Sequence, residues 1–335
     1  MKIGLVVTTI QAPNPVMQAL AAQAQASRAE FVVIGDRKSP PVFELEGADY
    51  YDLARQNQVL PEFSQALPVG HYARKNLGYL LALQRGCDWL LETDDDNYPL
   101  DNFFSLVRGD ELRARRLRSE SRWLNAYRYF SPSEPVWPRG YPLEKLAEDL
   151  ASKASEQWEL ERPALVQGLA DDNPDVDAVY RLTRPLPVNF DRQAAAISLE
   201  SGLWCPFNSQ NTWFRRDVAA LCYLPSYCSF RMTDIWRSFV AQRCLWALGE
   251  RLIFTAPSVR QERNEHNLLR DFADEVPGYL NNERIVSALD ACELKGEVRG
   301  DLRRCYQALV TLGVIPEKEL ALVDLWLAGL PPSTA

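Results

Sequence analysis

The chain has 335 residues, 47% of them hydrophobic, which is enough to fill the core of one large α/β domain or two small ones. Its 45 Asp and Glu outnumber its 37 Lys and Arg, and the net charge of -8 argues against a nucleic-acid partner. The start shows no signal-peptide pattern, and no apolar stretch reaches the roughly 18 to 20 residues of a membrane helix, so we expect a soluble, cytoplasmic protein without a transmembrane segment.

The seven cysteines are scattered without a CxxC pair, and we expect them to be buried thiols. The chain has only two histidines, His71 and His266. A structural zinc site is usually built from four Cys or His ligands, so this composition does not favour one. Any bound metal ion should therefore be a hard one, held by oxygen atoms.

The first hundred residues alternate between apolar, β-branched runs and helical patterns. Strands are predicted at residues 2–8, 30–34 and 88–92, and helices at 13–28 and 71–85. This order implies right-handed parallel crossovers, and the carboxyl ends of such strands face the crevice where α/β sheets bind ligands. Thr8, Thr9, Asp36 and the run from Asp94 to Asp96 all stand at such ends.

The rest of the chain is less regular. Residues 101–167 are predicted to form an insertion of loops and helices over the site. Strands are expected at 176–182, 211–214 and 251–255, and an amphipathic helix at 234–248, with Thr233 or Asp234 placed to cap it. We therefore expect one main domain, residues 1–265, followed by a mostly helical segment, residues 266–335.

Asp94, Asp95 and Asp96 are three adjacent carboxylates, which repel one another unless solvent or a cation neutralises them. Mg²⁺ and Mn²⁺ typically take one or two carboxylates while substrate phosphates and water complete the shell. The run therefore favours a site for a metal ion and a nucleotide diphosphate. A solvated turn is the alternative, because Asp and Asn favour turns and Pro99 follows closely.

Two further residues are candidates for chemistry at this site. A carboxylate at Asp234 can cap the predicted helix, and it can also act as a general base if the helix end faces the acidic run. His266 lies in the polar stretch 260–267. Its imidazole is either an ordinary structural side chain or a third protein ligand of the metal ion.

A phosphate-bearing ligand also needs cations and polar contacts. Arg74 and Lys75 precede the acidic strand and can supply the cations, although they can equally be solvated charges. The stretch 204–213 has aromatic rings and amides of the kind that sugars use, and Asn208 and Gln210 are its candidate donor-binding residues. The same stretch can instead be the edge of the core.

Several motifs, taken together, resemble the STELLO-type glycosyltransferases, first described as Golgi membrane proteins of plants. They are HYARKNLGYLLALQRGCDWLLETDDDN (71–97), NPDVDAVYRLTR (173–184), PFNSQNTWF (206–214), and MTDIWRSFVAQRCLWALGERLIF with RQERNEHNLLRDF (within 232–272). A more distant similarity is to the reversibly glycosylated polypeptides that act as UDP-arabinopyranose mutases. It rests on Arg74, residues 78–80, Asp94 to Asp96 and residues 234–236.

The resemblance implies a GT-A fold, a Rossmann-like mixed sheet flanked by helices, in which an aspartate motif binds Mn²⁺ or Mg²⁺ and the donor. Asp94 then matches the ribose or metal contact, and Asp96 the main metal ligand. Asp95 is expected to bind the donor. The alternative is that Asp95 only shapes the turn. Asp234 matches the base of inverting enzymes, and His266 the C-terminal metal position. The plant proteins have an N-terminal membrane anchor and this chain begins with the first strand, so Golgi-type residence is not expected.

These expectations combine into a metal-dependent glycosyltransferase that moves a sugar from a nucleotide diphosphate sugar to a hydroxyl acceptor, in the assembly of a surface glycan or glycoconjugate. Inversion at the anomeric carbon follows if Asp234 is the base, and a retaining course returns if it is not. A nucleotide-sugar mutase with the same donor site is one alternative. A non-catalytic partner of a glycan synthase is another. The sequence does not determine the oligomeric state.

Overall fold

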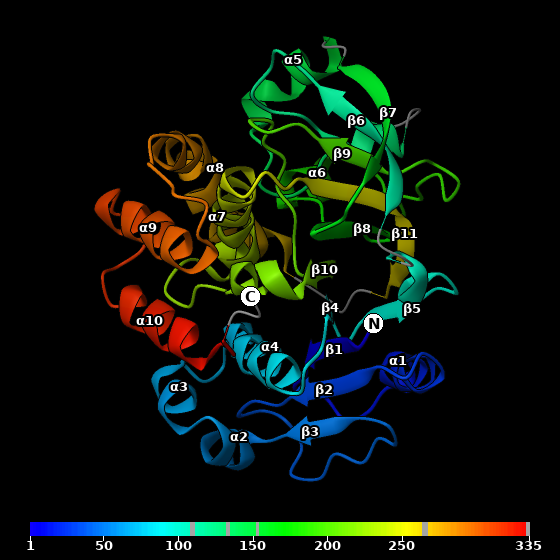
Figure 1. Cartoon of the computed structure of the whole chain (residues 1–335). Helices are drawn as coiled ribbons and strands as arrows, with labels where there is room; N and C mark the ends of the chain where they lie inside the picture. The colour runs from blue at the N-terminus through cyan, green and yellow to red at the C-terminus, as the bar shows by residue number, and fades with distance from the viewer. Residues whose placement is uncertain (108–110, 132–134, 152–153, 263–266, 333–335) are drawn as a thin grey trace.

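The computed structural model describes residues 1–107, 111–131, 135–151, 154–262 and 267–332. Within these ranges the chain forms a mixed α/β fold around an 11-stranded sheet with helices on its faces, as the GT-A expectation requires. Figure 1 shows β2 and β3 near one end of the sheet and β6 and β7 near the other, with the helices from α7 to α10 gathered beside it.

The strands pair in the order β3-β2-β1-β4-β10-β8-β11-β9-β6-β7, and β5 pairs with β11. Strands β1, β2 and β4 are parallel, whereas β10 runs antiparallel to β4 and β8. The strands are β1 (Ile3–Thr8), β2 (Glu30–Ile34), β3 (Asp49–Tyr51), β4 (Trp89–Thr93), β5 (Asn97–Pro99), β6 (Leu112–Arg118), β7 (Ser155–Glu161), β8 (Leu165–Asp171), β9 (Ile197–Leu199), β10 (Asn211–Arg215) and β11 (Leu252–Gln261).

The helices cover both faces of the sheet. They are α1 (Pro15–Ala26), α2 (Leu53–Val59), α3 (Pro61–Ala66), α4 (Lys75–Gln84), α5 (Leu146–Ala151), α6 (Ala178–Thr183), α7 (Thr233–Ala247), α8 (Leu268–Asp290), α9 (Val298–Thr311) and α10 (Glu319–Gly329). The helical character expected for the C-terminal segment is confirmed. None of the helices in the described ranges is both long and apolar enough to cross a bilayer.

Strand β1 is apolar along its length because both of its faces are covered. Leu5 and Val7 belong to the hydrophobic cluster with α1, while Val6 belongs to the cluster with α4. Helix α4 approaches the sheet closely at Gly78, where a Cβ atom would lie 2.4 Å from Val6 Cγ1. Strands that are buried on both faces have continuous apolar runs, and this is why β1, β2 and β4 could be predicted from the sequence.

Two sequence-based assignments are wrong. The apolar run 176–182, predicted as a strand, instead contains α6, whose first turn is capped by the Asp177 side chain, which accepts from the Tyr180 N–H at 2.7 Å. The segment 101–167, expected as loops and helices, contributes β6, β7 and the first three residues of β8 to the sheet. β6 and β7 were missed because their sequences are charged and half-exposed. In β8, Gly168 interrupts the apolar pattern.

The start of α7 also differs from expectation. The N-cap position belongs to Met232, and no side-chain hydrogen bond caps the helix. Thr233 and Asp234 are already inside the first turn. The Asp234 carboxylate therefore does not serve as the cap of its own helix, and it is directed at other partners.

A buried ion pair joins α7 to the strand that leads into the acidic run. Arg237 Nη1 lies 2.7 Å from Glu92 Oε1, and both side chains are at most 1% exposed. Burial raises the pKa of Glu92, while the Arg237 charge acts in the opposite direction. The Glu92 carboxylate also accepts from the Tyr79 hydroxyl of α4. Three elements that surround the site are thus tied together beneath it.

We expect Arg237→Met to lower the free energy of unfolding by about 3–5 kcal/mol, because it leaves the Glu92 carboxylate buried without its counter-charge. Urea unfolding at neutral pH measures the loss. Arg303→Met is the matched control, since the Arg303–Asp324 pair is 36% and 55% exposed and should be worth less than about 1 kcal/mol. Equal effects of the two substitutions would contradict a special role for the buried pair.

Candidate functional site

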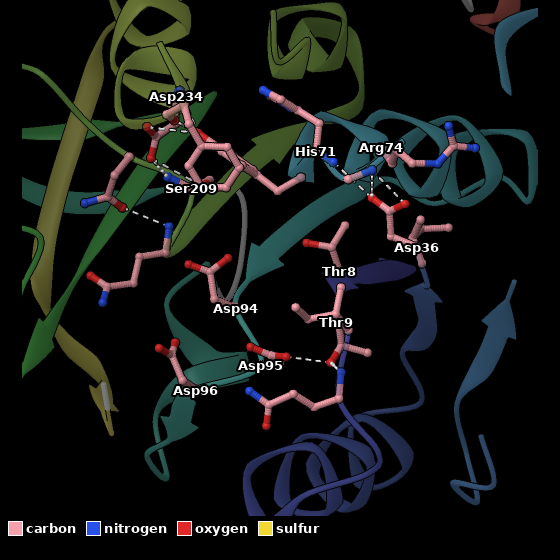
Figure 2. Close-up of a pocket in the computed structure, with 18 of the residues that line it drawn as sticks. Thr8, Thr9, Asp36, His71, Arg74, Asp94, Asp95, Asp96, Ser209 and Asp234 are labelled. Carbon is pink, nitrogen blue, oxygen red and sulfur yellow. Dashed lines mark hydrogen bonds between the residues drawn. The ribbon is translucent and has the colours of Figure 1, made fainter. Parts of the chain in front are cut away.

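A cavity of about 450 Å³ opens at the carboxyl ends of β1, β2 and β4 (Figure 2). Ten of the site residues predicted from the sequence line it: Thr8, Thr9, Asp36, Arg74, Asp94, Asp95, Asp96, Asn208, Gln210 and Asp234. Lys75, the other predicted cation, does not line it. His266 lies outside the described residues. In Figure 2 the acidic run lies between Asp234 and Ser209 on one side and Thr8, Thr9 and Asp36 on the other.

Asp94 is held by a lysine from below. Lys75 is fully buried, and its ammonium group lies 2.8 Å from Asp94 Oδ1 and 3.0 Å from the Thr93 carbonyl oxygen. The Asp94 side chain is 37% exposed. Lys75 therefore neutralises part of the acidic run within the protein, and it is neither a solvated charge nor placed to reach a phosphate past Asp94.

Asp95 has a structural partner as well. The Thr9 hydroxyl donates to Asp95 Oδ2 at 2.5 Å, and the Asn14 side chain donates to the Asp95 carbonyl oxygen at 2.9 Å. Burial, together with the neighbouring Asp94, raises the pKa of Asp95. Asp95 thus fastens the end of β4 to the start of α1, which fits the role of shaping the turn.

Asp96 is joined to the last strand of the sheet. Both of its carboxylate oxygens accept from the Gln261 side-chain amide, at 3.2 and 3.3 Å, and its carbonyl oxygen accepts from the Glu262 N–H at 2.8 Å. Asp96 therefore lies at the cavity wall next to the end of β11. Its side chain is half-buried.

A divalent ion would have a limited set of protein ligands here. Among the described residues, no group of three or more His, Cys, Asp or Glu side chains is placed to hold a metal ion. Asp94 and Asp96 nevertheless line the same cavity. One or two carboxylates completed by phosphate oxygens and water is the arrangement that Mg²⁺ and Mn²⁺ use with nucleotides, so these residues fit such an ion.

Asp234 stands on the opposite wall, in a network of donors. Its Oδ2 accepts from Arg139 Nη2 at 2.9 Å, from the Ser209 N–H at 3.2 Å and from the Ser209 hydroxyl at 3.4 Å. Its Oδ1 accepts from the Tyr72 hydroxyl at 3.3 Å. Arg139 also makes a two-pronged pair with Asp175, at 2.8 and 2.9 Å. Within the described chain, Oδ1 is therefore the less occupied oxygen.

The charge state of Asp234 is set by this network. Burial on its own would raise the pKa of Asp234, but Arg139, helped by Arg237 and Arg231, outweighs it and lowers the pKa below its usual value. The carboxyl group is therefore ionised at neutral pH. Burial and the nearby Asp234 charge raise the pKa of Tyr72 well above its usual value, so its hydroxyl remains a donor.

The predicted phosphate contact at Arg74 is corrected by the structure. Its guanidinium is 2% exposed, and its nitrogen atoms donate to Gln56 Oε1, to Ser64 and to the Leu67 carbonyl oxygen. These bonds use all five of its N–H groups. In Figure 2 the guanidinium points away from the acidic run. Arg74 supports the wall of the cavity, and its side chain has no donor left for a phosphate.

Asp36 also serves the chain itself. Its carboxylate accepts from the N–H groups of Gly70 at 2.7 and 2.8 Å, of His71 at 3.0 Å and of Arg37 at 2.6 Å. Gly70 has a φ of +75°, a conformation that favours glycine. Asp36 thereby fixes the turn that leads into His71. The carboxylate of this predicted donor-binding residue is thus occupied by backbone donors.

Asn208 and Gln210 line the cavity in a tight turn. The Gln210 N–H donates to Asn208 Oδ1 at 2.9 Å, and the Gln210 side chain donates to Asn97 at 3.2 Å. The Asn208 carbonyl oxygen accepts from Arg237 at 2.7 Å. The buried ion pair therefore also positions this turn.

Several residues of the site were not predicted from the sequence, among them Tyr72, Arg139 and Asp175. Arg139 lies in the irregular part of the chain, and nothing in its local pattern shows that it meets Asp234, 95 residues later. Tyr72 meets Asp234 across 162 residues. The aromatic and charged character of such residues is visible in the sequence, but their convergence is produced only by the fold.

Comparison with known proteins agrees with the resemblance found in the sequence. The family model described as STELLO glycosyltransferases matches residues 231–332, the part that begins just before α7. Probable glycosyltransferase STELLO2 of Arabidopsis thaliana is 27% identical over 303 residues, which cover 85% of this chain and 38% of that protein.

Probable glycosyltransferase STELLO1 of the same plant is 25% identical over 326 residues, which cover 90% of this chain and 41% of that protein. The chain thus spans about two fifths of the length of the curated relatives that it matches. Residues 231–332 thus match the model of the STELLO glycosyltransferases, and the chain is similar to these two plant proteins along most of its own length.

Proposed function

We propose that the protein is a metal-dependent glycosyltransferase that moves a sugar from a nucleotide diphosphate sugar to a hydroxyl acceptor. The observation that carries the proposal is that Asp94 and Asp96 share one cavity with Asp234, which stands on its opposite side (Figure 2). A leaving diphosphate and an incoming hydroxyl need different partners, and this cavity has a candidate for each. The glycosyltransferase names of both relatives support the same class of reaction.

On the donor side, Asp94 and Asp96 would hold Mn²⁺ or Mg²⁺. When bound, such an ion offsets the negative charge that develops on the leaving diphosphate. Lys75 keeps Asp94 in place through its ion pair, and the Gln261 amide orients the Asp96 carboxylate at the cavity wall. Exposed Lys38, at the cavity wall, takes the place of Arg74 as the cation that meets the phosphates.

On the acceptor side, Asp234 would remove the proton of the attacking hydroxyl. Its carboxyl group is ionised at neutral pH because Arg139 lowers its pKa, so it is in the form that accepts a proton. A carboxylate with a low pKa is a weak base, and it accepts the proton mainly as the hydroxyl becomes acidic during bond formation. Attack from the wall opposite the diphosphate gives inversion. Assembly of a surface glycan or glycoconjugate is the process in which we place this reaction.

The metal site is tested by Asp96→Asn. We expect Mn²⁺ and a nucleoside diphosphate, UDP or GDP, together to raise the melting temperature of the wild type, with a stabilisation of about 2.7 kcal/mol when the ligand is at a hundred times its dissociation constant. EDTA should abolish the rise. Asp96→Asn should lose the Mn²⁺-dependent part, because an amide is a poorer ligand for a hard cation.

Asp101→Asn is the matched control, since Asp101 is an exposed aspartate in the turn that follows β5. It should keep the full Mn²⁺-dependent rise. A rise that survives in Asp96→Asn would remove Asp96 from the metal site. No rise in the wild type with either nucleotide would overturn the donor site itself.

The base is tested by Asp234→Asn. We expect sugar transfer to fall by about 10²- to 10⁴-fold, the usual contribution of general-base catalysis, while nucleotide binding is unchanged. Asp175→Asn is the control, because it removes the same charge from the other carboxylate that pairs with Arg139. Rates of product formation with a defined donor and acceptor measure both. Full activity of Asp234→Asn, or an equal loss in the two variants, would contradict the assignment.

A further inference from the structure

Three aromatic rings stand together at the wall of the cavity beside Asp234. The rings of His71 and Tyr72 are stacked, with centroids 5.5 Å apart and an interplanar angle of 8°. Phe230 meets both rings edge-on, at centroid distances of 5.3 and 4.8 Å. All three residues line the cavity. We call this set, His71, Tyr72 and Phe230, the aromatic shelf.

The shelf offers an uncharged, partly exposed surface. Phe230 is 50% exposed, in contrast to the phenylalanines of the core. Burial lowers the pKa of His71 to about 4, and its Nδ1 accepts from the Ala73 N–H at 3.1 Å. His71 is therefore neutral at physiological pH. An exposed apolar ring at the wall of a polar cavity indicates a ligand with an apolar face.

The shelf is joined to the less occupied oxygen of Asp234. The Tyr72 hydroxyl donates to Asp234 Oδ1 at 3.3 Å and accepts from the Asp234 N–H at 3.2 Å. Phe230 lies four residues before Asp234, in the short 3₁₀ helix Phe230–Met232 that leads into α7. A ligand that rests on the Phe230 ring is thus held next to the carboxylate.

We propose that the aromatic shelf is the acceptor-binding subsite and that it takes a pyranose ring. This inference rests on the proposed function, in which Asp234 accepts the proton of the acceptor. The ligand must combine an apolar face, to cover an aromatic ring, with hydroxyl groups around its edge, one of which reaches Asp234 Oδ1. A pyranose has both features, whereas a nucleobase has the flat face but no alcohol to be glycosylated.

The shelf residues have separate parts in this arrangement. Phe230 supplies the exposed surface on which the sugar lies. Tyr72 holds Asp234 through its hydroxyl and supports the Phe230 ring from the side, so it acts as a positioning residue. His71 supports Tyr72 from behind by stacking, and its backbone N–H is fixed by Asp36.

The test is saturation-transfer NMR with methyl β-D-glucopyranoside, methyl β-D-galactopyranoside and methyl β-D-xylopyranoside as the probes. At least one should receive saturation from the wild-type protein at its ring C–H protons. Sorbitol, an open-chain polyol without a ring face, should receive none. Phe230→Ala should reduce the signal by about five-fold or more, and Phe230→Trp should keep it.

Phe272→Ala is the matched control, because Phe272 is a phenylalanine of α8 that is 38% exposed and packs on Tyr279. It should leave the signal unchanged. The subsite is overturned if none of the three pyranosides receives saturation, or if Phe230→Ala and Phe272→Ala give the same signal as the wild type.

The outcome is separable from that of the proposed function. Melting temperatures with Mn²⁺ and UDP or GDP, measured on the same Phe230→Ala protein, should equal those of the wild type, because Phe230 is placed on the acceptor side. If nucleotides stabilise the protein but the pyranosides do not bind, the shelf fails and the donor site stands. If pyranosides bind at Phe230 and no nucleotide binds, the shelf stands as a carbohydrate site and the transferase proposal fails.

Discussion

The ion pair between Arg237 and Glu92 is the interaction on which the geometry of the site depends. It connects α7, which carries Asp234, to β4, which runs into Asp94, and it does so in the interior, where both side chains are at most 1% exposed. The other terminal nitrogen of the same guanidinium, Nη2, donates a hydrogen bond to the Asn208 carbonyl oxygen. One cation thus fixes three segments that are distant in the sequence. In a low-dielectric interior such a pair tolerates little displacement without a large cost.

With this frame in place, each acidic side chain of the cavity has its own partner. Lys75 is paired with Asp94, the Thr9 hydroxyl with Asp95 and Arg139 with Asp234. Because each carboxylate has its own partner, several of them can line a cavity of about 450 Å³ despite their mutual repulsion.

The sequence pattern predicted the strands that are buried on both faces. It missed strands that are charged and partly exposed. Strands β1, β2 and β4 are mostly apolar, and the polar residues that follow them line one cavity. β6 and β7 are an antiparallel pair at the edge of the sheet and carry many charged residues, so their apolar alternation is weak. The run 176–182 was read as a strand because its apolar residues outweighed the capping signal at Asp177.

Side-chain roles were harder to predict than positions. Arg74 lies where a phosphate contact was expected, yet its guanidinium turns back to Gln56 and Ser64, a choice that depends on α2 and α3 being packed behind it. The pairing of Arg139 with Asp234 joins residues that no local pattern relates. A carboxylate or guanidinium in a motif therefore indicates a location, and the neighbours brought by the fold decide what that group can bind.

The central claim is that one cavity holds a divalent ion together with the donor diphosphate, with Asp96 as a ligand of the ion. Anomalous diffraction from crystals soaked with Mn²⁺ and UDP or GDP tests it most directly. The account predicts one manganese peak in the cavity, in contact with the Asp96 carboxylate and with diphosphate oxygens, while Lys75 remains paired with Asp94. A nucleotide seated in the cavity without a manganese peak, or manganese and nucleotide bound away from Asp96, would contradict it.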